Sequence, residues 1–124
     1  MEEKRPRDIR ERTFGFALEV VRLCRKLDGR PSVAKTLGKQ LLRSGTSIGA
    51  NIEEAQAGQS RADFVNKYAI ALKEARETIY WIRLLRESGE YTDGQIEQTQ
   101  REAEEIAKII GSIIVSTKKN MKSC

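Results

Sequence analysis

The stretch SGTSIGAN, residues 44–51, decides how this chain can fold. Glycine, serine and threonine crowd into it, which is typical of loops that cradle phosphate groups. Such a loop needs the order Gly-x-x-x-x-Gly-Lys-Ser/Thr, because its lysine reaches the phosphates. Here Gly45 and Gly49 are four residues apart and Ala50 follows, so the phosphate-loop interpretation fails.

The residues on both sides of the stretch show a helical repeat instead. Positions spaced alternately by four and three residues form one seam: Leu37, Leu41, Ser44, Ile48, Asn51 and Ala55. This spacing is the heptad pattern of a helix that packs against other helices. Gly45 and Gly49 then permit close approach of a neighbouring backbone, by geometric analogy with small-residue motifs of membrane helices. The sequence therefore predicts a helix through the stretch.

A helix made of these residues carries a cost that some gain must offset. Each helical glycine costs about 1 kcal/mol relative to alanine. A buried serine or asparagine without a partner costs ~1–3 kcal/mol more. One possible gain is a polar layer around Ser44 and Asn51 that fixes register and oligomeric state. The candidate partners for that layer on the third helix are Glu74, Glu77 and Tyr80.

Two other gains are open at this point. Small residues can make room for large aromatic side chains, and a kink in the helix can present Arg43 and the backbone to a ligand. The aromatic candidates for the first of these gains are Phe14, Phe16, Phe64 and Trp81.

The first helix is expected over residues 13–27, and its apolar residues cover more than one face. They form two interleaved series, one at positions 14, 17, 21 and 24 and the other at 16, 20, 23 and 27. A helix that is apolar on more than one face must be covered on more than one face. Either a partner chain or a wide buried stripe within one subunit supplies that cover.

Turn and capping signals separate four helices. Gly29 and Pro31 end the first helix and begin the second. Ser60 opens a capping box before a helix that should run to about Ser88, and Thr92 opens another before the last helix. No segment alternates with period two. The sequence therefore predicts an all-α, antiparallel up-down four-helix bundle.

Length and composition place this bundle in one domain. The chain has 124 residues, 39% of them hydrophobic, which favours a single helical domain. We expect a charged N-terminal tail at 1–12, the bundle at 13–118 and a basic C-terminal tail at 119–124. Cys24 and Cys124 stand alone without metal-site spacing, which favours the reducing cytoplasm. No signal peptide is visible, and the longest apolar run, residues 109–115, is too short to span a bilayer.

The residues give little support to catalysis or metal binding. The chain has no histidine, which excludes an imidazole base and histidine-containing metal sites. Convergent carboxylates are available at Glu53, Glu54, Glu74 and Glu77. Carboxylates on long helices are usually solvated or structural, so we expect no enzyme, no cofactor and no metal site.

The net charge of +5 favours an anionic partner. The spacing of Lys35, Lys39 and Arg43 places them on one helical face, and the C-terminal end adds Lys118, Lys119 and Lys122. All six are candidate phosphate contacts, with a solvated stripe as the competing interpretation. Because no stacking aromatics are apparent on an exposed face, we expect salt-sensitive binding to the backbone rather than base reading.

Three stretches resemble one bacterial family. They are LLRSGTSIGANIEEAQAGQS at residues 41–60, DFVNKYAIALKEARETIYWIRLL at 63–85 and IIGSIIVSTKKN at 109–120. They are similar to the bacterial four-helix-bundle proteins also called 23S rRNA-intervening-sequence proteins. The similarity spans roughly residues 13–120.

This resemblance implies an up-down four-helix bundle that assembles as a homopentamer, which would carry a charge of about +25 from five +5 chains. It also implies a relationship to the accessory variability proteins of diversity-generating retroelements, which are basic pentameric barrels that bind nucleic acid and a reverse transcriptase. The polar signature of the family falls here on Arg43, Ser44, Ser47, Asn51, Glu54, Phe64, Lys67 and Glu74.

Two functions of different classes follow. One is a non-catalytic oligomeric protein that binds RNA or DNA through the backbone, as an accessory to an RNA or reverse-transcriptase complex. The other is a structural scaffold that holds a protein partner and makes no contact with nucleic acid. For both functions we expect that the chain associates with itself and does not bind a membrane. In both, a structural polar layer is expected from Ser44, Ser47, Asn51, Glu54, Glu74 and Glu77.

Overall fold

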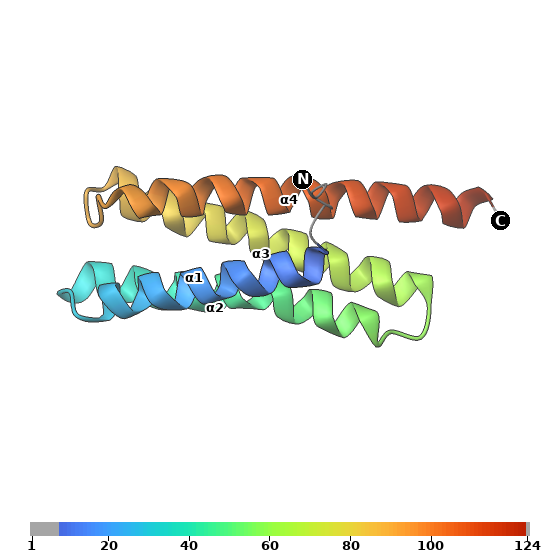
Figure 1. Ribbon diagram of the computed structural model, residues 1–124, viewed down its shortest axis with the longest axis horizontal. Coiled ribbons are helices and arrows are strands. Elements are labelled where there is room, and N and C mark those ends of the chain that lie inside the picture. The colour runs from blue at the N-terminus through green and yellow to red at the C-terminus, as the bar shows by residue number, and fades with distance from the viewer. Residues whose placement is uncertain (1–7, 124) are drawn as a thin grey trace, which may run out of the picture.

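The computed structural model describes residues 8–123, which form four long α-helices joined by short turns, with no strand among them. The helices lie along one common direction, with the α1–α2 and α3–α4 turns at one end and the α2–α3 turn at the other (Figure 1). Their bounds are α1 Ile9–Asp28, α2 Ser32–Gln56, α3 Arg61–Glu87 and α4 Gly94–Ser123. The stretch at residues 44–51 lies inside α2, so the predicted helix there is confirmed.

Side-chain caps define the starts of three helices. Asp8 accepts a hydrogen bond from the Arg10 backbone N–H at 3.0 Å, and Ser60 accepts one from the Asp63 N–H at 3.1 Å, as predicted. At α4 the predicted cap, Thr92, is wrong by one residue. The Asp93 carboxylate accepts from the Gln95 N–H at 3.1 Å, because Asp93 stands two residues before that donor, as in an Asx turn.

The first and last helices are longer than the sequence predicts. α1 begins at Ile9 rather than Thr13, because a bidentate salt bridge holds its first turns to α4. The Arg12 guanidinium donates two hydrogen bonds of 2.8 Å to the Glu102 carboxylate. α4 continues to Ser123, where lysines in its last turns suit the negative end of the helix dipole. Residues 1–7 and Cys124, which carry part of both predicted tails, lie outside the described residues.

The predicted seams form the core. The seam of α3 is buried from Tyr68 to Leu85, and the seam of α4 is buried from Ile96 to Ile110. In α1 the series at 16, 20, 23 and 27 is buried. The second series is only partly covered, because Phe14 keeps 64% of its surface exposed. One face of α1 therefore remains apolar and open in the single chain.

The two turns at one end of the bundle contact each other. Gly89 adopts a positive φ of 80°, which lets the chain reverse after α3. Tyr91 then donates its N–H to the Leu85 carbonyl at 3.0 Å and is buried. The Arg30 guanidinium, from the α1–α2 turn, lies 5.5 Å from the centre of the Tyr91 ring. This cation–π contact joins the two helical hairpins at that end.

Within the described part of the chain, none of the helices combines the length and the apolar character needed to cross a membrane. α1 packs mainly on α2, α2 on α3 and α3 on α4, while the contact between α1 and α4 is smaller. The last turns of α4 extend past the start of α1 (Figure 1). The arrangement places α2, with its glycine-rich and serine-rich stretch, between α1 and α3.

Candidate functional site

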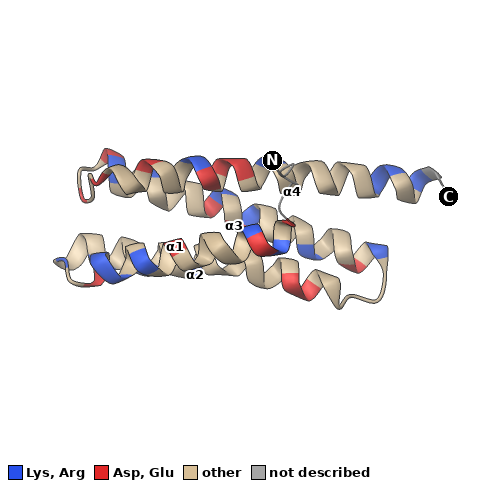
Figure 2. Cartoon of the chain, in the orientation of Figure 1, with Lys and Arg blue, Asp and Glu red and all other residues tan. Residues whose placement is uncertain are grey.

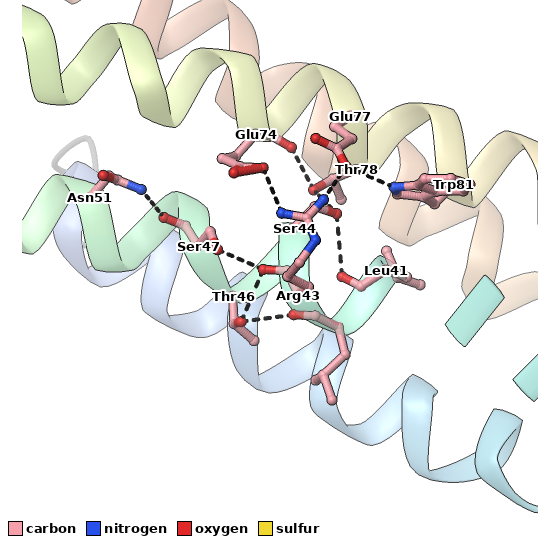
Figure 3. A network of polar contacts seen from close by, with 11 residues as sticks. Leu41, Arg43, Ser44, Thr46, Ser47, Asn51, Glu74, Glu77, Thr78 and Trp81 are labelled. Carbon is pink, nitrogen blue, oxygen red and sulfur yellow. Dashed lines mark hydrogen bonds and ion pairs between the residues drawn. The ribbon is translucent and has the colours of Figure 1, made fainter. Parts of the chain in front are cut away.

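A polar contact between α2 and α3 lies in the middle of the bundle, and we call it the polar waist (Figure 3). Its members are Arg43, Ser44, Glu74, Glu77, Thr78 and Trp81. Ser44 and Thr78 are fully buried, and their hydroxyl oxygens share a hydrogen bond of 2.9 Å. The Thr78 hydroxyl also lies 2.7 Å from the Glu74 carbonyl oxygen. Both buried hydroxyls therefore have partners, which removes the penalty expected for burying them.

The partner of Ser44 differs from the predicted ones. Glu74, Glu77 and Tyr80 were the candidates, and the structure places Thr78 there instead. Thr78 belongs to the buried seam of α3, whereas the Tyr80 side chain is 56% exposed. The signal for Thr78 is its own seam position, because a polar residue in an apolar series needs a polar neighbour.

Arg43 joins α2 to the two carboxylates at the edge of the waist. Its guanidinium lies 3.4 Å from Glu74 Oε1 and forms a second ion pair with Glu77 Oε1. The same Glu77 oxygen accepts a hydrogen bond from the Trp81 indole N–H at 3.3 Å. The predicted phosphate contact Arg43 therefore has its charge compensated within the chain. Glu74 and Glu77, predicted members of the layer, both contact this one cation of α2.

The other predicted members of the layer bond elsewhere. Ser47 donates its hydroxyl to the Arg43 carbonyl at 2.7 Å, and the Asn51 side-chain amide donates to the Ser47 carbonyl at 2.9 Å. Both are bonds within α2, on a partly exposed surface, so Asn51 is not a core partner of α3. Glu54 pairs with Lys67 Nζ at 2.7 Å, farther along the same two helices. Lys67 belongs to the family signature but not to the predicted layer.

The opposite face of α2 is shaped by glycine. A Cβ added to Gly45 would lie 2.9 Å from both methyl groups of Val20, and one added to Gly49 would lie 3.3 Å from the Thr13 hydroxyl oxygen. The glycines therefore bring α1 close to α2, as predicted for small residues. At Gly45 and Gly49 the nearest atoms belong to Val20 and Thr13, and not to the aromatic candidates Phe14, Phe16, Phe64 and Trp81. These two neighbours lie on the α1 seam that faces α2.

A basic face covers the second half of α1 and the first half of α2. Between residues 20 and 52 the chain has seven Lys/Arg and one Asp, a local charge of +6. Figure 2 shows Lys and Arg gathered near the α1–α2 end of these helices, with acidic residues along the first half of α4. The exposed cations of these two half-helices and the turn between them, apart from the paired Arg43, are Arg22, Arg25, Lys26, Arg30, Lys35 and Lys39, of which Lys26 contacts Gln95 of α4 and Arg30 lies on Tyr91.

The six predicted phosphate contacts do not lie together in one chain. Lys35 and Lys39 are exposed near the α1–α2 turn, and Arg43 belongs to the waist. Lys118, Lys119 and Lys122 lie on the last turns of α4, at the opposite end of the bundle (Figure 2). The structure thus divides them into a basic face and a basic end.

Three of the four carboxylates considered for catalysis are engaged by cations. Glu74 and Glu77 contact Arg43, and Glu54 contacts Lys67. Within residues 8–123, no group of three or more Cys, Asp or Glu side chains is placed to hold a metal ion. Burial raises the pKa of the Cys24 thiol to about 11, so this side chain is a neutral thiol at physiological pH.

Comparisons with known proteins agree with this architecture. Residues 6–112 match the family described as 23S rRNA-intervening sequence protein. A crystal structure of a protein of unknown function from the S23 ribosomal protein family of Bacteroides thetaiotaomicron is 46% identical, with a TM-score of 0.80. The match covers 86% of this chain and 98% of that one. Among curated proteins no significant match is found.

Proposed function

Because the chain belongs to the 23S rRNA-intervening sequence protein family, we propose that it is a non-catalytic nucleic-acid-binding protein. It forms an antiparallel up-down bundle that assembles as a homopentamer and contacts the backbone of RNA or DNA without sequence specificity. It serves as an accessory to an RNA or reverse-transcriptase complex in the cytoplasm. The free thiol of Cys24 is compatible with that compartment.

The observation that carries the proposal is the basic face of α1 and α2. Apart from the paired Arg43, six cations stand against one acid within 33 consecutive residues, although the whole chain carries only +5. Phosphate contacts of this kind release counterions, so affinity falls with salt by a log–log slope of about −0.9 per phosphate. Lys35 and Lys39 are one helical turn apart and exposed, which suits contacts to a phosphate backbone.

The open apolar row on α1 supports self-association. Phe14 and Leu18 are four residues apart and keep 64% and 40% of their surfaces exposed. An i, i+4 pair of large apolar residues on the outer face of a helix is a surface that another copy can cover. In a pentamer the charges of five basic faces add up, and their combined field is strong enough to steer nucleic acid toward the protein.

A protein-scaffold function is the second candidate, and a different surface favours it. Tyr80 of α3 and Val115 of α4 keep more than half of their surfaces exposed, on helices that do not carry the basic face. Exposed apolar residues of this kind suit a protein partner such as a polymerase or a reverse transcriptase. In this function the positive charge would serve solubility.

A salt series distinguishes the two functions. Binding of duplex DNA and structured RNA is measured by fluorescence anisotropy between 50 and 200 mM salt, with mass by light scattering. With about four phosphate contacts, we expect affinity to fall about 100-fold over this range, and we expect a pentamer mass. The variant Lys35→Glu with Lys39→Glu should abolish binding. As a matched control, Lys73→Glu with Lys108→Glu changes the charge equally on α3 and α4 and should weaken it less.

Absence of binding at 50 mM salt would reject the nucleic-acid function and leave the scaffold. A monomeric mass would reject the oligomer and the summation of charge.

A further inference from the structure

A groove of about 280 Å³ runs between α1 and α2 within the basic face. α1 contributes Val21, Cys24, Arg25 and Asp28, and α2 contributes Lys35, Gly38, Lys39 and Leu42. In each helix these positions have the spacing i, i+3, i+4, i+7, which places them on one side of that helix. The groove is therefore built by two facing helix surfaces, without any flexible loop.

The floor of this groove is apolar and closely packed. A Cβ added to Gly38 would lie 3.1 Å from the Leu27 Cβ, so glycine allows the two helices to approach there. The Cys24 thiol donates a hydrogen bond to the Gly38 carbonyl at 3.3 Å, which satisfies a backbone acceptor in the floor. Val21 is half-buried and Leu42 keeps 39% of its surface exposed. An uncharged apolar surface thus remains open at the bottom.

The rim of the groove is positively charged. Among residues 8–123, Arg25 and Lys39 make no ion pair with an acidic side chain. Lys35 lies 4.0 Å from Asp28, but both side chains are well exposed and such pairs contribute little. A bare phosphate would make no contact with the apolar floor, and a purely apolar ligand would not pair with the three cations. The ligand that matches both is an anion with a flat or apolar body.

We propose that this groove holds one unstacked base of a single-stranded nucleic acid. The base lies on Val21 and Leu42, the Arg25 guanidinium covers its other face, and Lys35 and Lys39 contact the flanking phosphates. Arginine stacks on planar rings, so it replaces the aromatic platform that this surface lacks. The volume is just below the ~300–1,000 Å³ of drug-sized ligand sites, which suits a single base. A paired base in a duplex cannot reach the floor.

This inference rests on the proposed nucleic-acid function and goes beyond backbone binding. It is tested with two single strands of equal length and charge, one with bases and one abasic, measured by fluorescence anisotropy at low salt with the full chain. Stacking of a base predicts that the base-containing strand binds about five-fold to 100-fold more tightly. If neither strand binds, this inference fails, whereas the binding of duplex DNA and structured RNA in the salt series still decides the proposed function. If both bind equally, only this inference is overturned.

Two variants locate the effect in the groove. Leu42→Asn removes the apolar floor, and Arg25→Lys keeps the charge while removing the planar stacking surface. Each should bring the affinity ratio between the two strands close to one. Val115→Asn removes an exposed apolar side chain on α4 and should leave the ratio as it is.

Circular dichroism and light scattering establish that each variant is folded. If Leu42→Asn leaves the affinity ratio unchanged and instead alters the oligomer mass, the groove holds a second copy of the chain, and the base-binding proposal is wrong.

Discussion

Within residues 44–51, α2 packs against α1 and α3 through two different kinds of contact. Toward α1 the stretch presents Gly45 and Gly49. Side chains of α1 occupy the space that a side chain at either glycine would need. Toward α3 it presents Ser44, whose hydroxyl is bonded to Thr78, beside the Arg43 ion pairs. The first face is sensitive to added volume, whereas the second is sensitive to the loss of a partner.

This difference explains why the stretch combines glycine with serine. A close helix contact and a polar contact are needed at one level of the bundle, and α2 lies between the two helices concerned. A row of leucines could satisfy neither, because leucine has no polar atom and its side chain would clash with Val20. The composition of this stretch resembles that of a loop, but it belongs to a helix that packs closely against one neighbouring helix and makes polar contacts with another.

The largest effect is expected on the glycine face. Gly45→Leu places a side chain where even a Cβ lies 2.9 Å from both Val20 methyls, so α1 must move away. Overpacking of this kind should lower the free energy of unfolding by about 3 kcal/mol, measured by urea denaturation. Gly111→Leu is the matched control, because nothing lies within 4 Å of its Cβ position, and it should be neutral or stabilising. A loss below about 1 kcal/mol for Gly45→Leu would contradict the close contact.

A smaller effect is expected at the buried hydroxyl pair. Thr78→Val leaves the Ser44 hydroxyl buried without its partner on α3, which should cost about 2 kcal/mol. Ser44→Ala should cost less, because Thr78 retains the Glu74 carbonyl as a partner. The double variant should be more stable than the sum of the two losses predicts, by about 1 kcal/mol, because both buried polar groups are then removed. Strict additivity in this cycle would show that the two hydroxyls do not interact.

The smallest effect is expected at the edge of the waist. Arg43→Met keeps the apolar stem and leaves Glu74 and Glu77 without their cation. Because half of the Arg43 side chain is exposed to solvent, we expect a loss of only about 1 kcal/mol at low salt, decreasing as salt is added. Lys67→Met, which removes the pair with Glu54, provides a second exposed site for comparison. A loss that does not change with salt would show that the charge of Arg43 does not stabilise the waist.

The sequence predicts the helices well and the partners less well. The seam through Ser44 and Ile48 follows from spacing alone, and the structure buries both residues. The start of α1 is missed, because the Arg12–Glu102 contact that holds it joins residues 90 positions apart. Asn51 is misplaced because a heptad position at the edge of a seam can face solvent after a small rotation of the helix.

The candidate binding residues divide in the same way. Lys35 and Lys39 lie on one exposed face, as their spacing indicates. Arg43 shares that spacing, and yet its charge is compensated by carboxylates of α3 that no local pattern links to it. The groove beside Lys39 includes Arg25 and Val21 of α1, which only the pairing of the two helices brings near.

The sequence by itself determined that residues 44–51 are helical and which residues of each helix are apolar, because periodicity is a property of consecutive residues. The tertiary structure alone decided that Gly45 faces Val20 while Ser44 faces Thr78. That choice depends on how each helix is rotated about its axis and which helix packs beside it. Both are set by the packing of all four helices together, which no single segment encodes.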